Sequence, residues 1–139
     1  MIEEYEVFVG RNYVEGIGRR KRAFARVRIY PEGTGVVLVN GKEAKEYFPR
    51  EGDFTTLFGP LEDTEIGRQM DVTVLVNGGG ITGQTGAVRL GVARALVKYD
   101  ENLRGTLREN GHLTRDPRIK ERKKFGLKRA CKAPTYTKR

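Results

Sequence analysis

Alternating apolar and charged residues in the first third of the chain predict β-strands. The clearest alternation lies in Ala23–Tyr30, where Ala25, Val27 and Ile29 share one face and arginines occupy the other. A period of two is typical of a strand with one buried face, here with a cationic exterior. The β-prone segment Glu6–Glu15 precedes it and ends in a turn at Gly16-Ile17-Gly18, and the fully apolar segment Val36–Val39 follows it and ends in the turn dipeptide Asn40-Gly41. Three strands in succession suggest an antiparallel meander.

Helical spacing dominates the second half of the chain. Five apolar residues recur at intervals of three and four, so they share the face of a helix that packs on the sheet: Val88, Val92, Ala95, Leu96 and Tyr99. A β-branched run before this helix predicts a central strand, and a capping residue after it predicts a second helix. These elements are a strand at Met70–Asn77, a helix opened by Ile81–Gly86, and a helix capped by Asp100 that buries Leu103 and Leu107 and ends at Asn110-Gly111.

The middle of the chain has a less regular pattern. Lys42–Phe48 has room for two helical turns, which Pro49 would end. From Arg50 to Gln69, three glycines and a proline interrupt any period, so we expect this stretch to be only partly helical. With 139 residues and 37% apolar composition, the chain has material for one modest core.

The net charge is concentrated at the C-terminal end of the chain. In total, 27 lysines and arginines against 18 acids give +9 at pH 7. Residues 1–110 hold 16 bases and 16 acids, whereas residues 111–139 hold 11 bases and two acids, so this tail carries the whole excess. Because like charges repel and apolar residues are few, we expect the tail to be disordered on its own. Its bases and interleaved aromatic rings suit it to threading through RNA.

The residue inventory excludes several classes of enzyme. The chain has one cysteine, one histidine and no serine, which rules out serine hydrolases. His112 and Cys131 are too few ligands for a zinc site, and a single cysteine fits a reducing compartment. No apolar run approaches the roughly 18 residues of a membrane helix, and the first residues lack a signal-peptide pattern. We therefore expect a soluble protein without a metal, a cofactor or a membrane partner.

A glycine-rich loop follows the predicted central strand. Gly78, Gly80 and Gly83 form a G-x-G-x-x-G pattern before a predicted helix. With Gly79 inside it and Asp100 about twenty residues on, the loop has the outline of a dinucleotide-binding site, so a small dinucleotide-binding enzyme is the alternative function. That site needs a second parallel strand to carry the acid, whereas the helix here leads into another helix. The loop either binds an anion such as an RNA phosphate through its backbone or only permits a tight turn.

A second group of cations lies on the part of the chain expected to fold. Between Gly16 and Tyr30 the sequence has no acid and six bases, namely Arg19, Arg20, Lys21, Arg22, Arg26 and Arg28. They place a cationic turn and strand on a rigid domain, whereas the tail offers a flexible cationic segment. The two together favour a structured RNA assembly over a simple charged tail.

Six sequence motifs and the last two residues, in order along the chain, resemble the bacterial-type small-subunit ribosomal protein S-nine family from about Tyr13 to Arg139. Two departures from the family pattern are Thr135 and Thr137, which stand for glutamine and serine, and Glu51–Gln69, which lacks the usual Met/Val-rich helix. The motifs are Gly18-Arg-Arg-Lys-Arg-Ala-Phe-Ala-Arg-Val-Arg28, Val39-Asn-Gly-Lys42, Tyr47-Phe-Pro-Arg50, Gly78-Gly-Gly-Ile-Thr-Gly-Gln-Thr-Gly-Ala-Val-Arg89, Leu113-Thr-Arg-Asp-Pro-Arg118, Glu121-Arg-Lys-Lys-Phe-Gly-Leu-Lys128 and the final Lys138-Arg139.

The resemblance implies an α+β fold like domain two of ribosomal protein S-five. This fold has a four-stranded mixed sheet, helices on one face and a left-handed βαβ crossover, an exception to the usual handedness. An extended basic C-terminal tail follows it. The resemblance also implies a non-catalytic protein in the head of the small subunit, on a cytoplasmic or organellar ribosome. Its implied partners are small-subunit ribosomal RNA, peptidyl-site tRNA and neighbouring ribosomal proteins.

The chain is expected to have three parts, two of which carry candidate RNA-binding residues. We expect an N-terminal extension or edge strand at 1–12, an RNA-binding domain at 13–110 and the tail at 111–139. The resemblance implies that Lys138 and Arg139 contact the anticodon stem-loop of the tRNA. The residues expected to bind ribosomal RNA are Arg19, Arg20, Lys21, Arg22, Arg115, Arg118, Arg122, Lys123, Lys124, Lys128, Arg129 and Lys132.

Overall fold

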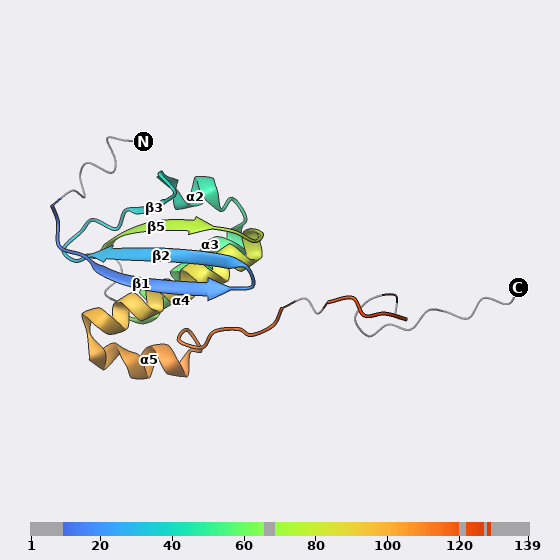
Figure 1. Ribbon diagram of the computed structural model, residues 1–139. Helices are drawn as coiled ribbons and strands as arrows, with labels where there is room; N and C mark the ends of the chain where they lie inside the picture. Colours follow the sequence, from blue (N-terminus) through green and yellow to red (C-terminus); the bar gives the residue numbers. More distant parts are fainter. Residues whose placement is uncertain (1–9, 66–68, 120–121, 127, 129–139) are drawn as a thin grey trace, which may run out of the picture.

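Five strands form one mixed sheet in the computed structural model, which describes residues 10–65, 69–119, 122–126 and 128 (Figure 1). The strands lie in the order β1-β2-β5-β3-β4. β3 and β5 are parallel, and the other neighbouring pairs are antiparallel. The strands are β1 (Val14–Arg20), β2 (Ala23–Tyr30), β3 (Val37–Val39), β4 (Lys42–Glu43) and β5 (Asp71–Asn77).

The main helix crosses behind β1 and β2 and builds the core with them (Figure 1). The helices are α2 (Ala44–Tyr47), α3 (Glu51–Asp63), α4 (Ile81–Tyr99), the short 3-10 helix η2 (Glu101–Leu103) and α5 (Arg104–Glu109). α4 packs on β1 and β2, and α3 packs on α4. Val27, Val74 and Val92 are among the side chains buried between these layers. The α+β class is confirmed, with five strands instead of four because Lys42–Glu43 forms a short edge strand.

β1 passes through Gly16-Ile17-Gly18, where the sequence pattern wrongly predicted a turn. A Cβ atom at Gly16 would lie 2.2 Å from the Gly91 carbonyl oxygen, and one at Gly18 would lie 1.8 Å from the Ala87 carbonyl oxygen. The two glycines therefore allow the backbone of α4 to lie directly on β1. A glycine inside a strand marks such a close approach as readily as it marks a turn.

β3 does not continue an antiparallel meander, because β5 lies between it and β2. The side chain of Asn40 fixes this position: its Nδ2 donates to the Val76 carbonyl oxygen at 2.8 Å, and its Oδ1 accepts from the Val76 backbone N–H at 2.9 Å. The parallel pairing of β3 with β5 across α2 and α3 makes a βαβ unit. The left-handed sense of this unit stays a prediction.

α3 is a continuous helix of 13 residues, although its sequence contains glycines and Pro60. Leu57 and Leu61 are buried four residues apart, so one face of α3 packs into the core and stabilises a helix of weak intrinsic propensity. α2 is shorter than expected because Lys42–Glu43 pairs with β3.

The second half of the chain follows the predicted pattern closely. β5 is a central strand, and four of the five expected positions of α4 are buried. The fifth, Tyr99, is 46% exposed because it lies at the last residue of α4. Asp100 caps the next helix by accepting a hydrogen bond from the Asn102 backbone N–H at 3.0 Å. Leu107 is fully buried as expected.

A buried carboxylate holds the connection between β2 and β3. Asp71 Oδ1 accepts hydrogen bonds from the backbone N–H groups of Thr34, Gly35 and Val36 at 2.9 to 3.0 Å. Its Oδ2 pairs with Arg11 Nη1 at 3.0 Å. Burial by itself raises the pKa of Asp71, but these hydrogen bonds outweigh it, and the pKa lies below its usual value of 3.8. The carboxylate therefore stabilises the folded chain in its ionised form.

Replacing Asp71 with asparagine is expected to lower the free energy of unfolding by about 1.5 to 3 kcal/mol, because hydrogen bonds to a charged acceptor are lost. The depressed pKa means that this contribution is present above the unfolded-state pKa of about 4 and is lost as the pH falls through the folded-state pKa. Urea unfolding from about pH 6 to about pH 3 measures it. The difference between wild type and Asp71→Asn should shrink towards the acid end, and a constant difference would contradict this role.

Candidate nucleic-acid interface

A cationic cavity lies where the end of β1 meets α4 and the chain after α5. We call it the arginine pocket. It has a volume of about 160 Å³. Its charged residues are Arg19, Arg20, Arg89, Arg115, Arg118 and Asp116, and Thr56, Gly86, Leu90 and Thr114 complete its lining. Four of these arginines are predicted RNA contacts from two separate parts of the sequence, and the fold brings them together.

Arg20 joins the three segments that form the arginine pocket. Its guanidinium donates from Nη1 to the Thr82 carbonyl oxygen at 3.4 Å and from Nη2 to Asp116 Oδ2 at 3.3 Å. A Cβ atom at Gly86 would lie 2.3 Å from Arg20 Cδ, so the arginine stem lies flat on α4. This packing fixes the position of the guanidinium group at the pocket.

Asp116 orders the tail side of the arginine pocket. It accepts from Arg118 through both carboxylate oxygens, with Nη2 to Oδ2 at 2.7 Å and Nε to Oδ1 at 3.0 Å. The side-chain hydrogen bond from Arg118, followed by that from the Arg118 backbone, holds the pKa of Asp116 well below its usual range. The ionised aspartate keeps two arginines in place but neutralises only one of five positive charges.

Two guanidinium nitrogens at the pocket have no acceptor in the part of the chain that the structure describes. These are the buried Nε atoms of Arg20 and Arg89. Arg89 is a residue that the sequence pattern missed, because a single arginine on an amphipathic helix normally faces solvent. A phosphate supplies several strong acceptor oxygens for the guanidinium groups that line a cavity. The arginine pocket therefore has the size and charge to hold a phosphate group.

The remaining predicted cations surround the pocket or extend from it. Lys21 and Arg22 form the exposed turn between β1 and β2. In the tail, Arg122, Lys123, Lys124 and Lys128 are exposed, and the aromatic ring of Phe125 is fully exposed beside them. Arg129, Lys132, Lys138 and Arg139 lie outside the described residues, as does Cys131.

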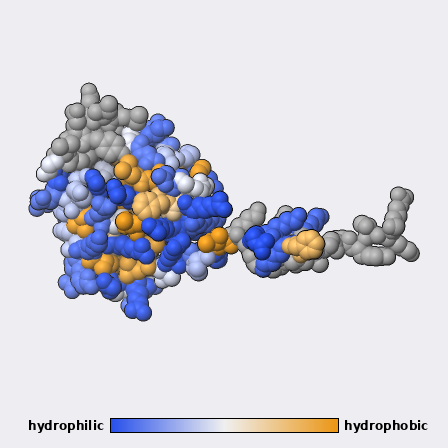
Figure 2. All heavy atoms as spheres, viewed as in Figure 1, coloured by the Kyte–Doolittle hydropathy of each residue, from blue (hydrophilic) through white to orange (hydrophobic). Residues whose placement is uncertain are grey.

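The open face of the sheet carries a second set of cations, as the alternation predicted. Figure 2 shows hydrophobic residues scattered among hydrophilic ones on this side of the molecule. Arg28 lies over the Tyr13 ring at 4.5 Å from its centroid, and Arg26 Nε pairs with Glu15 at 3.0 Å. Because Glu15 offsets part of the charge and an aromatic ring covers another part, this face is less cationic than the arginine pocket.

The glycine loop supports a tight turn. Gly78 and Gly79 have positive φ angles of 77° and 64°, and a Cβ atom at Gly78 would lie 2.6 Å from the Arg22 carbonyl oxygen. Gly80 caps α4 without a side chain, and Gly83 lies against the same β1–β2 turn. α4 leads into η2 and α5, so the strand that a dinucleotide site requires does not follow it in the described chain. The loop's binding of an anion stays a prediction.

His112 has a structural partner. Its Nε2 lies 2.5 Å from Asp63 Oδ2, and its ring is buried, so it ties the chain after α5 to the end of α3. Within the described ranges, no cluster of three or more metal-ligating side chains occurs. No described helix is long and apolar enough to cross a membrane.

An α+β domain that gathers arginines from three segments round a phosphate-sized cavity has the features of a nucleic-acid-binding protein. Comparison with known families gives the particular class. Residues 18–139 match the model of the family described as ribosomal protein S9/S16, so the chain belongs to this family. It is accordingly a ribosomal protein of the small subunit, a component of a ribonucleoprotein that acts in translation.

Proposed function

We propose that this protein is a structural component of the head of the small ribosomal subunit and binds ribosomal RNA through the arginine pocket. The observation that supports this most is that five arginines line one cavity with a single acid, Asp116, among its described lining. RNA supplies phosphate oxygens along its whole backbone. The arginine pocket anchors the domain, and the exposed turn at Lys21 and Arg22 adds contacts beside it.

The chain after α5 continues this cationic surface away from the domain. Arg115 and Arg118 line the arginine pocket, and the chain after α5 runs away from the domain (Figure 1). The bases that follow in its described part, Arg122, Lys123, Lys124 and Lys128, are exposed. We infer that the tail passes along ribosomal RNA to the peptidyl site, where Lys138 and Arg139 contact the tRNA. From Arg118, a fully extended chain of 22 residues would span roughly 70 Å. The role is structural and needs no cofactor.

Deleting Lys138 and Arg139 is expected to weaken peptidyl-site tRNA binding without preventing assembly of the subunit. Each charge-assisted contact to a phosphate is worth about 1.5 to 3 kcal/mol locally. Filter binding of tRNA to purified subunits measures the change, and sedimentation of the same subunits confirms their assembly. Arg104→Ala/Arg108→Ala is the matched control, because it removes two bases from the exposed surface of α5 and leaves the length of the tail unchanged. Unchanged tRNA affinity in the terminal deletion would refute the assigned role of the tail.

A further inference from the structure

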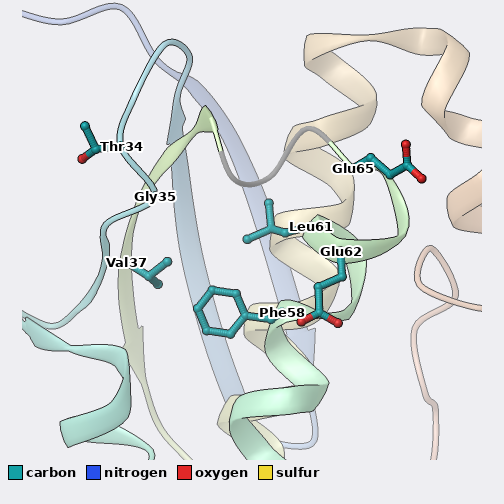
Figure 3. Close-up of a pocket in the computed structure, with 7 residues that line it drawn as sticks. All are labelled: Thr34, Gly35, Val37, Phe58, Leu61, Glu62 and Glu65. Carbon is teal, nitrogen blue, oxygen red and sulfur yellow. The ribbon is translucent and has the colours of Figure 1, made fainter.

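An acid-rimmed groove lies between the β2–β3 connection and α3, and the proposed RNA contacts do not use it. Its volume is about 950 Å³. Figure 3 shows Phe58 and Leu61 pointing from α3 towards Val37, with Glu62 and Glu65 farther along the same segment. A neighbouring hollow of about 300 Å³ shares Val37 and Phe58 and extends towards Val36 and Glu43. The groove thus has an apolar floor with Glu62 and Glu65 along its rim, and the neighbouring hollow adds Glu43 and one base, Lys45.

The charge of this groove is opposite to that of the chain as a whole. Residues 51–65 contain five acids and no base, in a protein of net charge +9, and two of these acids, Glu62 and Glu65, line the groove. Carboxylates on a rim repel RNA phosphates and attract lysine and arginine side chains. An apolar floor also suits a peptide better than a polyanion. The groove therefore fits a protein segment that carries both bases and apolar residues.

The wall formed by the β2–β3 connection is held in place before any partner binds. Asp71 accepts the backbone N–H groups of Thr34, Gly35 and Val36, so this wall has little freedom to lose on binding. β4 pairs with β3 only at Leu38 and Val39. In the described chain, Val37 is the one residue of β3 with no strand beside it on that side. An extended segment therefore has room to lie beside this short open edge.

We propose that the groove binds an extended, lysine- and arginine-rich segment of a neighbouring protein in the same ribosomal subunit. The inference rests on the proposed function, because it places the chain in a subunit with other proteins. The basic tail of this chain is the less suitable occupant of the groove. The contact between Asp116 and Arg20 holds the first part of the tail at the arginine pocket.

Photo-crosslinking in intact subunits tests this proposal. Val36 is 43% exposed and lines the hollow beside the groove, so p-benzoylphenylalanine at this position should crosslink to a basic peptide of another protein. Arg108, which is exposed on α5, provides the control position for the probe. In the charge-reversed variant Glu62→Lys/Glu65→Lys, the yield of the Val36 crosslink should fall at least about tenfold, because the rim would then repel basic side chains. Glu101→Lys/Glu109→Lys, with the same change in charge outside the groove, should leave the yield unchanged.

Other outcomes would overturn the proposal. These are a crosslink to ribosomal RNA, to the chain's own tail or to a second copy of the chain, a yield no higher than that at Arg108, or a yield that charge reversal leaves unchanged. The sedimentation gradients that isolate the subunits for crosslinking also report whether the wild-type chain sediments with the subunit. Its absence there would overturn the proposed function and this inference together. Its presence without a protein crosslink at the groove would overturn the inference alone.

Discussion

Replacing Gly18 with alanine is expected to destabilise the protein by about 3 kcal/mol or more, the upper range for inserting an atom into a packed core. A Cβ atom there would lie 1.8 Å from the Ala87 carbonyl oxygen and 2.4 Å from the Gly91 backbone nitrogen. Both are backbone atoms of α4, so no side chain can move aside, and β1 and α4 would have to separate. Since small domains are stable by only about 5 to 15 kcal/mol, this one methyl group removes a large share of the stability.

Urea unfolding followed by circular dichroism measures this effect, and Gly52 offers a matched control. A Cβ atom at Gly52 would meet no atom within 4 Å, and the residue lies in α3. Gly52→Ala is therefore expected to be neutral or to stabilise the protein by up to about 1 kcal/mol through helix propensity. Equal unfolding midpoints for Gly18→Ala and wild type would show that α4 does not lie on β1 as described.

Replacing Arg20 and Arg89 together with alanine is expected to weaken binding to ribosomal RNA about a hundredfold. Each guanidinium that meets a phosphate contributes about 1.5 to 3 kcal/mol, and a loss of about 3 kcal/mol corresponds to two factors of ten. Fewer phosphate contacts also release fewer counterions, so the dependence of the affinity on salt should become shallower by about one to two units of slope. Both changes follow from the same two contacts.

A titration of small-subunit RNA at several salt concentrations gives the affinity and the slope together. The matched control is Arg104→Ala/Arg108→Ala, which removes the same charge from the exposed surface of α5. Because Arg104 and Arg108 lie outside the arginine pocket, this control should lose only a small part of the affinity. If the two double variants lose affinity equally, the protein binds RNA through its overall charge, and the arginine pocket has no special role.

Local sequence patterns predict a strand or helix correctly when residues close to it in the sequence determine its structure. Ala23–Tyr30 alternates because one face of β2 is buried and the other is open. Asp100 caps a helix through an N–H two residues away. The order of strands in the sheet depends instead on contacts between residues far apart in the sequence. β3 lies beside β5 because Asn40 bonds to Val76, 36 residues along the chain, and no periodicity near Val36–Val39 reports that contact.

Gly16, Gly18 and α3 show a second limit of prediction from local sequence. Two glycines so close together are typical of a turn. Only the proximity of Gly16 and Gly18 to Gly91 and Ala87 shows that these glycines let α4 pack on β1. α3 has weak intrinsic propensity, and the burial of its leucines against the core makes it a helix. In both cases tertiary contacts decide the local structure.

The candidate site could be predicted in its chemistry but not in its arrangement. The sequence singles out Arg19 and Arg20 as one cluster and Arg115 and Arg118 as another, about a hundred residues apart. The fold places them round a single cavity and adds Arg89, whose helical pattern is that of an ordinary surface residue. Arg89 follows Gly86 by three residues, so both lie on the same face of α4, and the stem of Arg20 packs on that face at Gly86. This spacing could have identified Arg89.

We expect specific contacts with ribosomal RNA to hold this chain in the small ribosomal subunit. Sedimentation of purified subunits through a high-salt gradient measures this, because salt weakens unspecific binding of a cation to RNA far more than a packed, hydrogen-bonded contact. The full-length chain should remain in the subunit fraction, and the Arg20→Ala/Arg89→Ala variant should be depleted from it. Recovery of the wild-type chain as free protein at the top of the gradient would show that no such contacts hold it in the subunit.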